Sequence, residues 1–149
     1  MTKSEAQKPG SADDSVRNED AEWVIREPEK NRVYDLEERT ARFGEAVIDF
    51  ANTIPKNPVT NRLISQLVGA STSVGANYVE ADDSVSKPRK LSGLKSIGTC
   101  RKEARESKHF LRMIARAVPE LKLQARELWM EARELHLIFS KIWRGRKNE

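Results

Sequence analysis

The chain contains few of the residues that build disulfide scaffolds or metal sites. Cys100 is the single cysteine among 149 residues, and His109 and His136 are the only histidines. One thiol cannot form an internal disulfide, and these three side chains are too few for a structural zinc site. We therefore expect no metal and no cofactor.

Long apolar runs are also missing. No stretch approaches the roughly 20 apolar residues that a membrane-spanning helix needs, and the first 30 residues lack the basic and apolar segments of a secretory signal. The expected location is the cytoplasm, without a membrane partner. Because aromatic residues make up 6% of the chain and charged residues 34%, the apolar side chains must be concentrated in stripes, which favours a helical bundle.

Common catalytic motifs are absent from the sequence. It has no glycine-rich phosphate-binding loop, no H-E-x-x-H and no G-x-S-x-G. Asp82 and Asp83 are adjacent in an expected loop but have no third metal ligand nearby in the sequence. We predict that the protein is not an enzyme and that His109 and His136 are structural; a small hydrolase with converging acidic residues is a minor alternative.

Four stretches with apolar residues at alternating steps of three and four predict four helices. They cover residues 35–54, 59–81, 87–118 and 119–144. Because their connections are short, neighbouring helices should be antiparallel, which predicts an all-α, up-down-up-down four-helix bundle over residues 34–144. Residues 1–33 are polar and rich in charge of both signs, so they are predicted to be a flexible N-terminal tail. Residues 145–149 are predicted to be a basic C-terminal tail.

The second predicted helix contains many small residues. They are Gly69, Ala70, Ser73, Gly75 and Ala76. Each interior glycine lowers helix propensity by about 1 kcal/mol relative to alanine, so the glycines favour close approach of a neighbouring backbone. A merely weak helix is the alternative.

Positive charge gathers on the third predicted helix. Residues 87–118 carry ten basic and two acidic side chains, in a chain whose net charge is +4. Five cations at steps of four, three, four and four should share one side of this helix, about 100° from the core row. These five, named here the basic ridge, are Arg101, Arg105, Lys108, Arg112 and Arg116. Either acidic side chains from residues 34–86 neutralise the ridge, or it binds a polyanion such as nucleic acid.

Four apolar residues exceed what a simple bundle core needs. They are Phe110 and Met113 on the third predicted helix, and Trp129 and Trp143 on the fourth. Aromatic residues outside a core are typical of subunit interfaces. These residues therefore predict a homo-oligomer, with a wide monomer core as the alternative.

Two stretches resemble a known family. They are S-T-S-V-G-A-N-Y-V-E-A at 71–81 and R-K-E-A-R-E-S-K-H-F-L-R at 101–112. Over about 34–144 the chain resembles the four-helix-bundle proteins encoded in 23S rRNA intervening sequences, a family similar to the accessory variability determinant (Avd-like) proteins of diversity-generating retroelements. The matching positions are Ser73, Asn77, Glu80, Lys102, Glu103, Ala104, Glu106, Phe110 and Leu111. The chain departs from the pattern at Ala81, where many members have glycine, and at His109-Phe110, where a Tyr-Trp pair is common.

The resemblance implies a five-membered ring of bundles with a basic surface, and, for the retroelement members, a reverse transcriptase and its template RNA as partners. Together with the basic ridge it leads to a hypothesis of function. The chain is expected to be a non-enzymatic, homopentameric accessory protein that binds structured RNA or other nucleic acid through the ridge. The alternative is a protein-interaction scaffold that recruits a partner such as a polymerase without binding nucleic acid itself.

Overall fold

The computed structural model describes residues 32–85 and 90–148. The contacts divide the chain between Asp35 and Leu36, and the bundle described below belongs to the second unit. The tail expected at residues 1–33 lies almost entirely outside the described residues, as does the end of the loop expected before the third helix.

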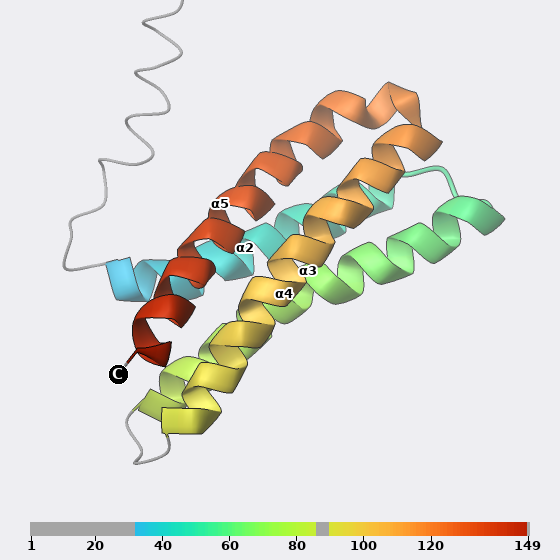
Figure 1. The fold of residues 1–149 in the computed structure, drawn as a ribbon. Coiled ribbons are helices and arrows are strands. Elements are labelled where there is room, and N and C mark those ends of the chain that lie inside the picture. The colour runs from blue at the N-terminus through green and yellow to red at the C-terminus, as the bar shows by residue number, and fades with distance from the viewer. Residues whose placement is uncertain (1–31, 86–89, 149) are drawn as a thin grey trace, which may run out of the picture. The chain divides into compact units, whose positions relative to one another are not determined.

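The described residues are helical except in short connections, and they include no strand (Figure 1). The elements are α2 (Arg32–Thr53), α3 (Pro58–Val85), α4 (Lys90–Ala117), the 3-10 turn η2 (Pro119–Leu121) and α5 (Lys122–Lys147). This arrangement confirms the predicted all-α four-helix bundle.

Paired contacts give the direction of each helix relative to its neighbours. Between α2 and α3, a Cβ added to Gly75 of α3 would lie beside Thr40 of α2. A Cβ added to Gly44 of α2 would lie beside Thr72 of α3. On α3 and α4, Ser71 contacts Ser107 and Val74 contacts Cys100. Residue numbers rise along one helix as they fall along the other, so both pairs of helices are antiparallel. An Arg39–Glu131 ion pair joins α2 to α5 and closes the bundle.

The helix boundaries extend beyond those predicted at three places. The helix α2 begins at Arg32, before the predicted start at residue 35. The helix α3 continues past Ala81 to Val85, so Asp82 and Asp83 are helical and not in a loop. No proline or glycine follows Ala81 until Pro88, and the backbone hydrogen bonds therefore continue. At the C-terminal end, α5 continues beyond Arg144 to Lys147.

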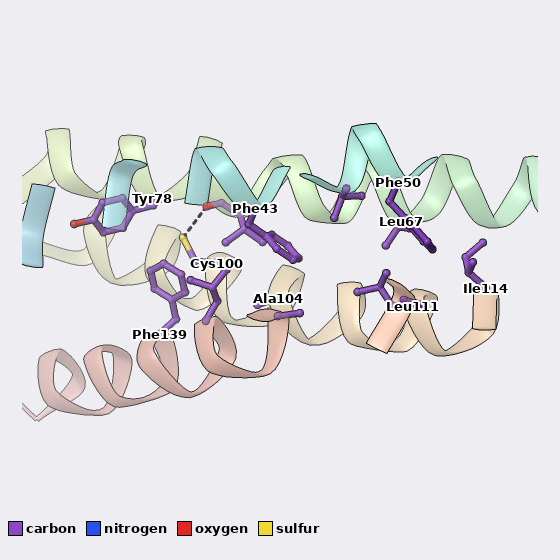
Figure 2. Close-up of a cluster of buried hydrophobic side chains, with 14 of the residues drawn as sticks. Phe43, Phe50, Leu67, Tyr78, Cys100, Ala104, Leu111, Ile114 and Phe139 are labelled. Carbon is purple, nitrogen blue, oxygen red and sulfur yellow. Dashed lines mark hydrogen bonds between the residues drawn. The ribbon is translucent and has the colours of Figure 1, made fainter. Parts of the chain in front are cut away.

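The predicted apolar rows form the core. Each helix contributes side chains to this core, and Figure 2 shows buried side chains converging between the helices. One example from each of the four helices, in chain order, is Phe43, Leu67, Leu111 and Phe139. Other core residues are Val47, Phe50, Ile54, Val74, Tyr78, Ala81, Ile97, Cys100, Ala104, Ile114, Val118, Ala125, Ala132 and Leu135. Burial of these apolar stripes, and not helix propensity, supplies most of the stability of such helices.

The two interior glycines of α3 differ in their surroundings. A Cβ at Gly75 would lie 3.1 Å from the hydroxyl oxygen of Thr40, whereas a Cβ at Gly69 would meet no atom within 4 Å. The predicted close approach of a neighbouring helix therefore occurs at Gly75, where α2 packs against α3. Within the subunit it does not occur at Gly69.

Candidate nucleic-acid interface

The basic ridge follows one side of α4. From Arg101 to Arg116 it extends about 22 Å along the helix axis, at a rise of 1.5 Å per residue. Arg105, Arg112 and Arg116 are exposed, and Arg101 and Lys108 are half-buried. The five predicted site residues therefore lie together on one helix, with three of the cations open to solvent.

Two of the ridge cations lie over indole rings of α5. The guanidinium carbon of Arg101 is 4.3 Å from the centroid of the Trp143 ring, and the ammonium nitrogen of Lys108 is 5.5 Å from that of Trp129. Lys147, at the end of α5, places its ammonium nitrogen 4.7 Å from Trp143. Such contacts stabilise by about 0.5–1 kcal/mol each at exposed sites. They hold the cations of α4 against α5.

The aromatic partners of the ridge are spaced by seven residues along α5. Trp129, His136 and Trp143, named here the aromatic row, are each half-buried, and both tryptophans pack against the core. Burial lowers the pKa of His136, and the positive charges of Lys108, Arg101 and Arg105 lower it further. His136 therefore faces the same strip of surface as the ridge.

Two carboxylates of the described residues form ion pairs with cations outside the ridge. Glu131 accepts two hydrogen bonds from Arg39, at 2.7 and 2.8 Å, and Glu38 pairs with Arg42 within α2. Among the residues that the structure describes, no carboxylate forms an ion pair with a ridge cation. The acidic side chains described between 36 and 81 thus leave the ridge without a direct ionic partner.

The predicted interface residues are partly covered within the subunit. Phe110, Trp129 and Trp143 pack against the core, and Met113 is half-buried. The burial of these residues matches the alternative of a wide core, while their role between subunits stays a prediction.

Sequence reasoning missed a more exposed apolar surface on α5. Leu123, Met130 and Leu137 are 76%, 56% and 48% exposed, and we name them the apolar row. Their seven-residue spacing places them on one side of the helix, next to the aromatic row and about 100° around the axis from it. That spacing was visible in the sequence, but it was hidden by the stronger core pattern of the same helix.

A second surface feature is a groove of about 360 Å³ between α2 and α3. The partly exposed Ile48 and Val79 contribute to its lining, and Glu37 and Glu45 lie at the same groove. No cluster of three or more His, Cys, Asp or Glu side chains suited to a metal occurs among the described residues. None of the described helices is long and apolar enough to span a membrane.

Fold and surface together define a four-helix bundle with a strip of cations and aromatic rings along α4 and α5. A solved structure from Bacteroides thetaiotaomicron VPI-5482, described as a protein of unknown function from the S23 ribosomal protein family, is similar to it. The TM-score is 0.63 at 16% sequence identity, and the match covers 75% of this chain and 97% of the other. No family model matches the chain, and no curated protein does. The similarity therefore supports the bundle fold.

Proposed function

We propose that this protein is a non-enzymatic, homo-oligomeric accessory protein that binds structured RNA or other nucleic acid through the basic ridge. The observation that carries the proposal is the ridge itself. Five aligned cations share one side of α4, and two of them are held by indole rings in place of carboxylates. A polyanion satisfies such a surface without displacing an existing ion pair of the described residues.

The binding would be electrostatic. Each phosphate neutralised by a lysine or arginine releases condensed counterions, so the logarithm of affinity falls linearly with the logarithm of salt concentration. Five phosphate contacts correspond to a slope of about −3.5 on single strands and about −4.5 on duplex. Several copies of the ridge in one assembly would raise the overall affinity through multivalency.

The apolar row supports the homo-oligomeric part of the proposal. Its three large apolar side chains are exposed on one side of α5, and exposed apolar surface of this kind marks sites of protein–protein interaction. The stoichiometry to test is five, which the family resemblance implies. Met130→Glu, at the centre of the row, should convert the assembly into a monomer, as measured by light scattering coupled to size-exclusion chromatography. An unchanged mass would exclude the apolar row as the interface.

The test of nucleic-acid binding reverses charge on the ridge. Fluorescence anisotropy of a labelled structured RNA, measured at several salt concentrations, should show steep salt dependence. The double variant Arg105→Glu with Arg112→Glu should abolish binding. Arg42→Glu with Arg62→Glu makes the same change in net charge on exposed positions of α2 and α3 and should weaken binding far less. Equal losses in the two variants would mean that only net charge matters, and absent binding would contradict the proposal.

The groove between α2 and α3 favours a second candidate, a protein-interaction scaffold. Exposed apolar patches on soluble proteins mark interaction sites, and a reverse transcriptase is the partner that the family resemblance implies. Under this reading RNA alone would not bind, and substitution of Ile48 and Val79 by serine would remove the protein partner.

A further inference from the structure

The ridge and the aromatic row are interleaved. Arg101 lies over Trp143 and Lys108 over Trp129, and the charges of Lys108, Arg101 and Arg105 act on His136 between the two rings. Planar rings and cations therefore alternate along the seam of α4 and α5. Electrostatic binding of phosphate alone requires the cations but not the rings.

The two elements of this strip also match in length. Trp129 and Trp143 are fourteen positions apart on α5, which is about 21 Å along the axis, and the ridge is about 22 Å long. At a rise of about 3.4 Å per nucleotide, a strand of about six stacked nucleotides spans the two indoles. Because Arg101 and Lys108 each lie over one of the indoles, a strand whose phosphates meet these two cations brings its bases close to the rings.

We propose that this strip binds an unpaired stretch of RNA, with the phosphates on the ridge and bases stacked on Trp129 and Trp143. The inference rests on the proposed function and names the class of RNA that the site selects. Unpaired bases stack on aromatic side chains and on arginine guanidinium planes, whereas the bases of a duplex are already stacked on one another. His136 adds a third planar ring between the indoles.

The experiment follows the fluorescence of the two indoles, because an indole that stacks on a base loses fluorescence. Trp23 is the remaining tryptophan of the chain, and Trp23→Phe in the full chain restricts the signal to the aromatic row. The probes are an unlabelled single-stranded RNA of about ten nucleotides and the blunt duplex of the same sequence. The single strand is longer than the stretch of about six nucleotides that spans the two rings. Anisotropy with labelled versions of both measures affinity in parallel.

We expect quenching by the single strand and little by the duplex, together with tighter binding of the single strand. Trp129→Leu and Trp143→Leu should each weaken single-strand binding by about tenfold and leave duplex binding nearly unchanged. Trp129→Phe and Trp143→Phe keep a ring at each position and should retain most of the affinity. Circular dichroism verifies that all four variants fold.

Three results would overturn the inference, and they differ in whether electrostatic binding through the ridge survives. If both RNAs bind equally and neither quenches the indoles, stacking is wrong although electrostatic binding through the ridge stands. If neither RNA binds at low salt, the proposed function fails and the inference fails with it. Equal losses for the leucine and phenylalanine variants would show that the indoles only support packing, which also contradicts stacking.

Discussion

The hydroxyl of Ser71 on α3 donates a hydrogen bond to the hydroxyl oxygen of Ser107 on α4, across 2.9 Å in the bundle interior. Ser107 in turn donates to the backbone carbonyl of Glu103, at 2.8 Å. Both serines are fully buried. The relay fixes the register of the two helices, because a shift of either helix would leave a buried hydroxyl without its partner.

Removing the two serine hydroxyls one at a time should lower the stability by different amounts. Ser107→Ala leaves the buried Ser71 donor without its acceptor and should lower the free energy of unfolding by about 1–3 kcal/mol. Ser71→Ala leaves Ser107 still bonded to Glu103 and should cost about 1 kcal/mol. Urea denaturation of both variants and of the double variant measures the costs, and the double variant should be less destabilised than their sum. Additive losses would show that the hydrogen bond contributes nothing.

The two glycines of α3 provide a matched pair. Gly69→Ala adds a methyl group in open space, so the helix propensity of alanine should raise the free energy of unfolding by about 1 kcal/mol. Gly75→Ala makes the same change within 3.1 Å of the Thr40 hydroxyl, which already donates to the carbonyl of Leu36. Crowding should offset the propensity gain there and make the change neutral or destabilising. Urea midpoints that rise equally in both variants would contradict the close approach.

The bundle was largely predictable from the sequence because the apolar residues of each helix recur at regular steps of three and four. The rows that contain Phe43, Leu67, Leu111 and Phe139 were each visible as three-four alternation, and burying such rows requires helix-on-helix packing. Boundaries were less predictable. The helix α3 runs on through Asp82 and Asp83, although aspartate and serine favour turns and caps over helix interiors.

The candidate site was predictable on one helix only. The ridge follows from spacing within α4, whereas its contact with Trp129 and Trp143 depends on the rotation of α5 about its axis. Tryptophans beside a core row are compatible with an exposed interface or with a half-buried seam, and the sequence alone favoured the former. Cross-helix pairs such as Arg101 over Trp143 appear only when both helices are placed.

The thiol of Cys100 should be unreactive in the folded protein. Its side chain is fully buried, and it donates to the carbonyl of Val74 at 3.4 Å (Figure 2). Burial raises the pKa of this thiol to about 12, so little of the reactive thiolate forms at pH 8. A chromogenic disulfide reagent should label Cys100 only after addition of denaturant, at a rate that follows unfolding. Rapid stoichiometric labelling without denaturant would contradict this burial.

His136 should couple stability to pH. Its pKa in the folded state lies below the ordinary value of about 6.5, first because of burial and then because of Lys108, Arg101 and Arg105. The unfolded chain therefore binds more protons between the two pKa values, so the free energy of unfolding falls as pH drops through and below about 6.5. Above that pH the imidazole is neutral in both the folded and the unfolded chain, so it does not lower the free energy of unfolding. Urea denaturation from pH 8 to pH 5 should show a smaller decline in His136→Gln, whereas an identical decline in both proteins would contradict the coupling.

RNA on the ridge should reverse this effect on His136. Phosphates beside Lys108 and Arg101 offset the positive charge that disfavours protonation, so binding should raise the pKa of His136. By linkage, RNA affinity should then increase as pH falls through that range. Proton NMR of the imidazole with and without RNA measures the pKa directly, and His136→Gln identifies the resonance by its loss. An unchanged His136 titration in saturating RNA would place the bound phosphates away from this part of the ridge.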